Sequence, residues 1–448
     1  MGSGVRIARN DRGWERPDET ASPGRPRDRS RTRGQNHTRW SRQRYVNTCP
    51  STGVFSEWLE RPRLRAGGDV EERSATWLEL FYDLVFVVTV AELVGLLSAG
   101  SSPPSVFAYV ALFVPVWWGW IGSTFYATRF DTDDLAHRLM TAVELFAVVA
   151  LAVNVHGAFG ETSRGFALAY AVLRGVLVIK YIGASRAVPE ARPLTIRYAR
   201  GFGLDAGLWF ASVFVPLPYR FGLWALGLLV SFGTPITAGS LHGELPPHAS
   251  HLPERFGLFT IIVLGESVVG LVHGASEQTF SLLAFLVGAF CVAVVFSLWW
   301  IYFDNLDGAA IRAAVAAGRT ADYQRWLYAH FPLAVGLAAV GVGIDHLLVA
   351  DPALRLPAAD RWLLCGALAV VFSAIGLIHR TTDACANRPV RTQSLHRFGG
   401  AGAVLVVAVL GGPLTPFAVA GVLVVICVTQ VILDLRERES TAEFSVGG

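Results

Sequence analysis

Long apolar runs dominate the sequence from residue 77 onward. Residues 105–124, 281–302 and 404–433 are free of Asp, Glu, Lys and Arg, and each run is about twenty residues or longer. With a rise of about 1.5 Å per residue, roughly twenty helical residues cross the hydrocarbon core of a bilayer. Runs of this length recur along the chain. The pattern therefore predicts an all-α fold, a polytopic transmembrane helical bundle.

The spacing of the runs predicts about twelve transmembrane spans. The last two are separated by Gly411, Gly412 and Pro413, which could mark either a turn or a kink within one helix. The expected spans cover residues 77–98, 105–125, 138–158, 165–184, 201–217, 221–241, 256–273, 281–303, 329–349, 362–379, 398–411 and 414–433.

The arginines indicate how the spans are oriented. If the basic N-terminus lies inside, the cytoplasmic segments hold Arg129, Arg138, Arg186, Arg192, Arg197, Arg200, Arg312, Arg319, Arg325, Arg380, Arg388, Arg391, Arg397, Arg436 and Arg438. The opposite loops then hold only Arg164, Arg220, Arg355 and Arg361. This alternation follows the positive-inside rule and predicts that both termini are cytoplasmic.

Two apolar segments are similar to each other. The segment from Glu79 reads ELFYDLVFVVTVAELVGLL, and the segment from Glu254 reads ERFGLFTIIVLGESVVGLV. Further features follow in the same order in both halves, namely a Trp pair and then a His at the start of the next helix (Trp117-Trp118 and His137; Trp299-Trp300 and His330). Six spans separate equivalent points. The sequence thus predicts two parallel six-helix repeats.

The repeat gives the expected domain organisation. Residues 1–73 are rich in Arg, Pro, Gly and Ser without apolar periodicity, and they are expected to form a disordered basic cytoplasmic N-terminal extension. Residues 74–245 form the first six-helix repeat and residues 246–435 the second, followed by a cytoplasmic tail over residues 436–448.

Composition narrows the class of protein. The chain is 52% hydrophobic and only 16% charged, which excludes an ordinary soluble enzyme. Its five cysteines form no CxxC pair, so neither a disulfide framework nor a metal site is indicated. The sequence shows no nucleophile–base pair, phosphate loop or cofactor motif, and an enzyme is the least favoured class. We expect no bound cofactor.

Ionisable residues inside the spans are the candidates for function. A charge at the centre of a bilayer costs about 2.5–3.5 kcal/mol on insertion scales, so each needs a partner or a role. One interpretation is a polar core between the halves that binds a cation or relays protons, with an arginine as counter-charge. The other is a set of purely structural buried pairs. The candidates for the polar core are Asp83, Glu92, Glu144, Arg174, Glu266 and His273.

A second set lies near the ends of the spans. These residues are expected at the rim of the bundle, where they would cap helices or pair between helices. They are Glu79, Glu254, Arg255 and His330.

Three motifs resemble the low temperature requirement A (LtrA) family of bacterial membrane proteins. They are ELFYDLVFV from Glu79, HLPERFGLFTIIVLGES from His251, and HFPLAVGLAAVGVGID from His330. The similarity runs from about residue 75 to residue 435. It implies a multi-span membrane protein whose molecular activity is not established, so it assigns no catalytic role. The polar positions that match the family pattern are Glu79, Asp83, His251, Glu254, Arg255, Glu266 and His330.

Three functions remain open at this stage. The first is a transporter or permease for a small solute or ion, proton-coupled through a site at Glu92, Glu266 and Arg174. The second is a cation channel, because the Phe81–Asp83 spacing is similar to the first-helix motif of a potassium-channel family with two six-helix repeats. The third is a non-transporting sensor or scaffold in cold or envelope adaptation.

These functions predict the cellular location and the binding partners of the protein. We expect a multi-pass protein of the bacterial inner (cytoplasmic) membrane, with the lipid bilayer and a small solute or ion as partners. A homodimer is left open, and no nucleic acid is expected. A transporter should hold unpaired carboxylates in a closed cavity, whereas a scaffold should have Glu92 and Glu266 fully paired.

Overall fold

The predicted all-α bundle is confirmed. The structure, a computed structural model, describes residues 62–64, 76–131, 134–239, 241, 251–304, 308–385 and 392–446. Among these residues, eleven helices are long and apolar enough to cross a membrane. The predicted disordered extension over residues 1–73 lies outside the described residues, apart from residues 62–64.

Two groups of helices account for nearly all of the described chain. The first group contains α1 (Trp77–Ser98), α2 (Pro103–Arg129), α3 (Leu135–Asn154), α4 (Ser163–Ala187), the short helix η1 (Pro189–Ala191), α5 (Arg192–Ser212) and α6 (Tyr219–Ala238). The second group contains α8 (His251–Ser276), α9 (Leu282–Phe303), α10 (Gly308–Ala316), α11 (Thr320–Val349), α12 (Ala358–Cys385), α13 (Thr392–Leu410) and α14 (Pro416–Val446).

A helix is present at each of the twelve predicted spans, but one of them is too polar to rank as a candidate span. The predicted fifth span corresponds to α5, which contains Arg192, Arg197, Arg200 and Asp205 within 21 residues. Gly411 to Pro413 form a turn between α13 and α14 and not a kink within one helix.

Side-chain caps determine where several helices begin. Thr76, Ser102, Asp134 and Ser281 precede α1, α2, α3 and α9, and each accepts a hydrogen bond from a backbone N–H in the first turn. Such caps satisfy N–H groups that have no partner within the helix. The short polar segments between apolar runs therefore set the ends of the spans.

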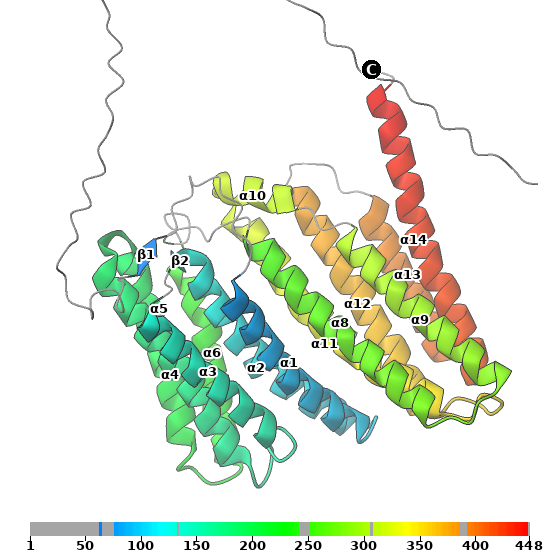
Figure 1. Ribbon diagram of the computed structural model, residues 1–448, viewed down its shortest axis with the longest axis horizontal. Coiled ribbons are helices and arrows are strands. Elements are labelled where there is room, and N and C mark those ends of the chain that lie inside the picture. The colour runs from blue at the N-terminus through cyan, green and yellow to red at the C-terminus, as the bar shows by residue number, and fades with distance from the viewer. Residues whose placement is uncertain are drawn as a thin grey trace, which may run out of the picture. The chain divides into compact units, whose positions relative to one another are not determined.

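The helices of the two groups pack in a corresponding order (Figure 1). In the first group α1 packs against α2 and α3, and then α3 against α4, α4 against α5 and α5 against α6. In the second group α8 packs against α9 and α11, and then α11 against α12, α12 against α13 and α13 against α14. The groups meet where α1 and α2 contact α8 and α11, a contact region that we call the seam.

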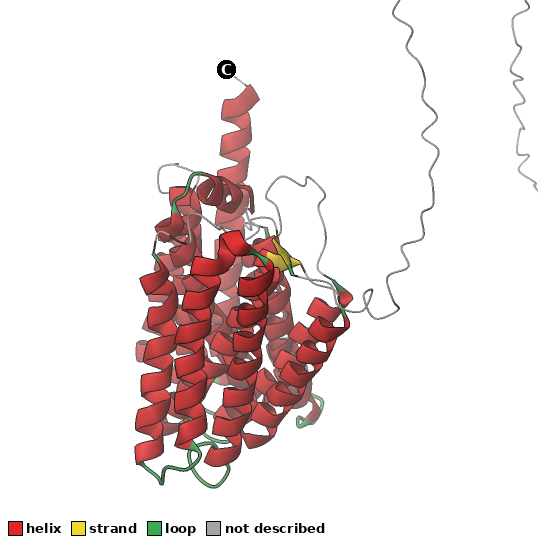
Figure 2. Cartoon of the chain, turned by 90° about the vertical axis from the view of Figure 1, so that its left-hand side faces the viewer, coloured by secondary structure: helices red, strands yellow, loops and turns green. Residues whose placement is uncertain are grey.

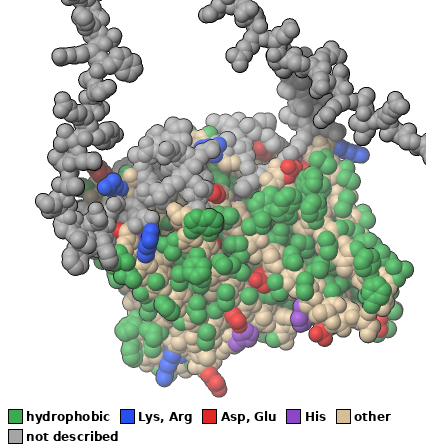
Figure 3. Space-filling view, viewed as in Figure 1, with side chains coloured by type: hydrophobic (Ala, Val, Ile, Leu, Met, Phe, Trp, Pro, Cys, Tyr) green, Lys and Arg blue, Asp and Glu red, His purple; other side chains and the backbone are tan. Residues whose placement is uncertain are grey.

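One helix is enclosed more than the others. Of the most apolar stretch of α11, 78% is buried, because α11 packs against α8 and α12 and also contacts α1, α2, α9 and α14. In α1, α3, α6, α9 and α14 only 33–39% of the equivalent stretch is buried. These helices direct large apolar side chains outward, and hydrophobic side chains cover much of the face drawn in Figure 3.

The end of the bundle where α1 begins and α14 ends is called the terminal end. There β1 (Arg63–Leu64) pairs antiparallel with β2 (Phe130–Asp131), which directly follows α2 (Figure 2). The segment that precedes α1 is therefore connected to the turn between α2 and α3. The other end of the bundle is called the opposite end.

Some arginines that the sequence placed in loops are buried in helices. Arg397 belongs to α13 and is fully buried, and Arg129 is buried at the end of α2. Arg220 in α6 and Arg361 in α12 are also buried, and both donate hydrogen bonds to backbone carbonyls. Hydropathy assigned them to loops because it registers the charge but not the buried acceptor.

Candidate functional site

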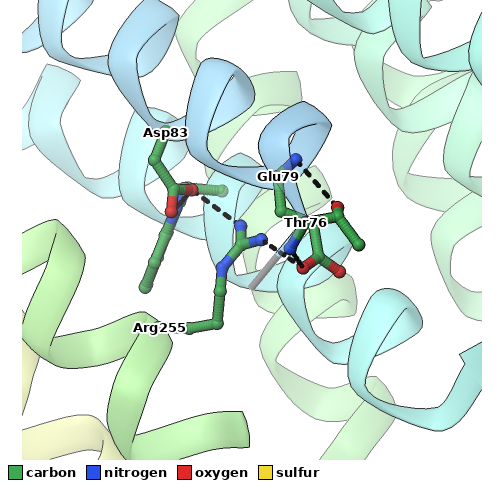
Figure 4. Close-up of polar contacts among 5 residues, drawn as sticks. Thr76, Glu79, Asp83 and Arg255 are labelled. Carbon is green, nitrogen blue, oxygen red and sulfur yellow. Dashed lines mark hydrogen bonds and ion pairs between the residues drawn. The ribbon is translucent and has the colours of Figure 1, made fainter. Parts of the chain in front are cut away.

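A buried ion-pair cluster joins the two groups near the terminal end (Figure 4). Thr76 and Glu79 form a capping box at the start of α1, in which each side chain accepts a hydrogen bond from the other residue's backbone N–H. One turn later, Asp83 is fully buried and points toward α8. The cap thus fixes the start of the helix that delivers this carboxylate.

Arg255 of α8 reaches across the seam to α1. Its Nη2 lies 2.7 Å from Oδ1 of Asp83, and its Nη1 lies 3.6 Å from Oε2 of Glu79. The indole N–H of Trp120 in α2 donates to the same Asp83 oxygen at 2.8 Å. Three helices from both groups therefore converge on one carboxylate.

One acceptor of this cluster has no donor in the described part of the chain. Asp83 and Glu79 both lie near the guanidinium of Arg255. The second oxygen of Asp83, Oδ2, is buried without a hydrogen-bond partner among the described residues. A buried acceptor without a donor is costly, so this oxygen is a position where a proton or a small cation could bind.

Two other predicted residues form ion pairs inside the first group. Glu144 of α3 pairs with Lys180 of α4 at 2.8 Å, and both side chains are buried. Arg174 of α4 pairs with Asp205 of α5, also at 2.8 Å, and both are fully buried. Arg174 therefore has its counter-charge within the first group and not in the seam.

A hydroxyl extends the Arg174 pair. Ser231 of α6 accepts from Arg174 Nη2 at 2.6 Å and from the indole N–H of Trp118 at 2.7 Å. The guanidinium also lies 4.1 Å from the ring centre of Phe202. Four helices of the first group share this network.

The structure does not bring Glu92, Glu266 and Arg174 together. Glu92 lies 3.2 Å from His156, and both of these side chains are about half exposed near the opposite end. Glu266 is 6% exposed, and its carboxylate makes no hydrogen bond or ion pair with any described residue. The three residues have different neighbours.

A one-residue difference in register explains why the two glutamates differ. Glu79 and Glu254 are 175 positions apart, as are Gly95 and Gly270, whereas Glu92 and Glu266 are 174 apart. One residue turns a side chain by about 100° around a helix. Glu92 consequently points toward His156 beyond the end of α3, whereas Glu266 is enclosed.

A substitution at Glu92 should have a small effect on stability, because this side chain is about half exposed. Replacing Glu92 with Gln should change the free energy of unfolding by less than about 1 kcal/mol, because a solvated ion pair contributes little. Thermal unfolding of the detergent-solubilised protein would measure this change. A loss above about 2 kcal/mol would contradict the assignment of Glu92 to an exposed pair.

Histidines and carboxylates pair repeatedly at the opposite end. His273 of α8 lies 2.8 Å from Asp345 of α11, and His346 of α11 lies 2.9 Å from Asp360 of α12. Ser101, between α1 and α2, donates to Asp360 at 3.0 Å. Nε2 of His346 lies 3.3 Å from the carbonyl oxygen of Ser98. The end of α1 is thus held by the second group.

The remaining rim residues differ in burial. Glu254 is partly buried and has interactions of its own. His330 is 3% exposed, and it lies 2.9 Å from the carbonyl oxygen of Trp326 and 3.1 Å from the hydroxyl of Tyr302. His330 is therefore part of the packed interior. The side chain of His251 lies outside the described residues.

Sequence reasoning did not identify Lys180, Arg397 and Asp434 as members of buried ion pairs. Lys180 is the only lysine of the chain and stands in an apolar span, which is a signal that it pairs with a buried carboxylate. In the second group, Arg397 pairs with Asp434 and also donates to the side chain of Gln430 at 2.7 Å. Asp434 could not be identified from the sequence because hydropathy placed it at the edge of the tail.

Among the described residues, no group of three or more His, Cys, Asp or Glu side chains could hold a metal ion. The clusters are instead paired charges that hold helices together. One oxygen in each of Asp83, Asp205 and Asp434 is buried without a hydrogen-bond donor among the described residues, although each of these residues has an arginine partner. Glu266, on helix α8 of the seam, differs from them because its carboxylate makes no hydrogen bond or ion pair with any described residue.

Comparison with known proteins agrees with the motifs. Residues 74–432 match the profile of the family described as "Bacterial low temperature requirement A protein (LtrA)". The chain is also 27% identical over 325 residues to "Uncharacterized protein RA0937" of Rhizobium meliloti (strain 1021), covering 68% of this chain and 76% of that protein. No solved structure matches. The chain is a multi-pass membrane protein and belongs to the bacterial low temperature requirement A family.

Proposed function

We propose that the protein is a secondary transporter for a small solute or ion in the bacterial cytoplasmic membrane, coupled to protons through Glu266. The observation that carries the proposal is the unpaired, buried carboxylate of Glu266 in α8. Each of the buried carboxylates Asp83, Glu144, Asp205 and Asp434 has an Arg or Lys partner.

The position of Glu266 suits a coupling site. Glu266 lies in α8, one of the four helices of the seam, and α8 contacts α1 and α2 of the first group. A carboxylate at membrane depth without a counter-charge must bind a proton or a mobile cation. Reversible binding at the contact between two helical groups is what alternating access requires.

The order of helix packing supports the same proposal. The first group and the second group pack in corresponding sequence, as expected for two parallel six-helix repeats. In transporters built from repeats, the coupling site lies between the repeats, and the groups move against each other around it. Glu266 satisfies this condition, whereas Glu92, at the half-exposed opposite end, does not.

Currents that follow a pH step test the coupling site without knowledge of the solute. The full chain is reconstituted into liposomes on a solid-supported membrane, and the external pH is stepped from about 7.5 to about 6.5, a range in which a functional carboxyl is expected to exchange its proton. We expect a transient, protein-dependent current that Glu266→Gln reduces at least about fivefold, since the amide cannot bind the proton.

Glu277→Gln is the matched control, because Glu277 is exposed just beyond α8 and its loss removes the same charge. It should leave the current unchanged. Equal currents from the wild type and Glu266→Gln would refute proton coupling at this residue.

The same liposomes, exposed to panels of amino acids, sugars and Na⁺ or K⁺, would then identify the solute. A proton current without flux of any panel member would favour a sensor over a transporter.

A further inference from the structure

A cavity opens in the seam between the two groups. It has a volume of about 310 Å³ and is lined by Val114, Trp117 and Trp118 of α2, Phe232 and Ile236 of α6, and Tyr328 and Phe331 of α11. Small-molecule sites in proteins usually have volumes of about 300–1,000 Å³, so the cavity is large enough for a ligand. It contains none of the charged residues of the candidate site.

The walls of the cavity are rigid aromatic rings. The rings of Trp118 and Tyr328 are nearly parallel, with their centres 6.1 Å apart, and Phe232 meets Trp118 edge-on at 4.4 Å. Trp117 and Phe331 also meet edge-on, at 5.2 Å. These mutual contacts fix the rings in position. The cavity therefore does not close by rotation of a single side chain.

The walls contain few polar groups, namely two indole N–H groups and the hydroxyl of Tyr328. The indole N–H of Trp118 is already donated to Ser231. The indole nitrogen of Trp117 is itself buried, so it is not accessible from the cavity. A water molecule needs two to four polar partners to remain in a cavity, and one hydroxyl does not supply them. The lining therefore favours an apolar occupant.

The surroundings supply an apolar occupant. α2, α6 and α11 are all candidate membrane spans, and Ile236 at the rim of the cavity is 72% exposed. The medium around the apolar part of a membrane span is hydrocarbon. An empty cavity loses dispersion contacts along its whole lining, and a flexible hydrocarbon chain restores them.

We infer that the cavity is a lipid-binding site that accommodates one acyl chain of a membrane phospholipid. The chain enters past Ile236 and lies against the rings of Trp118 and Phe331. It contacts α2 and α6 of the first group and α11 of the second group, so the lipid bridges the seam. This inference is independent of proton coupling at Glu266, which lies outside the lining of the cavity.

Photocrosslinking tests the inference. The full chain is reconstituted with a phosphatidylcholine that carries a diazirine on its acyl chain, irradiated, and mapped by peptide mass spectrometry. We expect crosslinks on the cavity segments of α2, α6 and α11 in addition to those on outward-facing residues such as Phe285 of α9, which is 60% exposed. Val114→Phe should reduce the cavity crosslinks at least threefold, because the added ring occupies the space.

Two further variants separate filling of the cavity from misfolding. Val106→Phe adds the same ring to an exposed position of α2 and should leave the crosslinks unchanged. Ile236→Trp narrows the entrance from another helix and should act like Val114→Phe. Crosslinks at Phe285 serve as the internal standard in every sample. Cavity labelling that is no stronger than at Phe285, or that persists in both filling variants, would overturn the inference.

Discussion

Replacing Arg255 with Met is expected to lower the free energy of unfolding by about 3–5 kcal/mol, because it leaves a buried carboxylate without its counter-charge. Asp83 is fully buried, and the guanidinium 2.7 Å away is its only cationic partner among the described residues. Trp120 would remain as a single neutral donor. Thermal unfolding in detergent, followed by near-UV circular dichroism, would measure the loss.

A double variant separates charge from packing. Asp83→Asn combined with Arg255→Met removes both charges, so we expect it to be more stable than Arg255→Met alone. Arg200→Met is the control, because Arg200 is exposed on α5 and should tolerate the change within about 0.5 kcal/mol. An Arg255→Met protein within about 1 kcal/mol of the wild type would show that the cluster does not hold the seam together.

Replacing Gly270 with Ala should force α8 and α11 apart and destabilise the second group by about 3 kcal/mol, at the upper end for overpacking. A Cβ atom at Gly270 would overlap the carbonyl oxygen of Gly341 in α11. From the other side, a Cβ atom at Gly341 would lie 2.8 Å from the carbonyl oxygen of Glu266. Both neighbours are backbone, which cannot rotate away as a side chain can.

The matched control is Gly288→Ala in α9, where a new Cβ atom meets nothing within 4 Å. Alanine has the higher helix propensity, by about 1 kcal/mol, so this variant should be as stable as the wild type or slightly more stable. The midpoint temperatures of the two variants give the comparison. If Gly270→Ala melted at the same temperature as Gly288→Ala, close packing of α8 on α11 would not contribute to stability.

The spans could be predicted because a single physical requirement sets their length and composition. The apolar run that became α9 was predicted at residues 281–303 and is found at Leu282–Phe303. The predicted fifth span began at residue 201, nine residues after the start of α5, because the exposed Arg192, Arg197 and Arg200 make the first part of this helix polar. Asp205, by contrast, is fully buried against Arg174 of the neighbouring helix, a pairing that hydropathy does not register.

The site was harder to predict than the fold. Burial of Glu266 and Asp83 follows from their positions in apolar spans, and the sequence indicated both as candidates. Their partners depend on which helices touch, and a single sequence does not encode that contact directly. The register difference between Glu92 and Glu266 was nevertheless readable, because the spacing between the two segments changes from 175 to 174 at these residues.

The contacts of α1 with the second group bear on which helices would move together. Near its start, α1 is joined to the second group through Asp83 and Arg255, and at its end through Ser98 and His346. The division predicted from the sequence falls near residue 245, but these contacts attach α1 to both sides of that division. If the two groups rock against each other, α1 therefore moves with the second group, although it precedes the first group in sequence. The turn at Gly100, which leads from α1 to α2, is then the hinge.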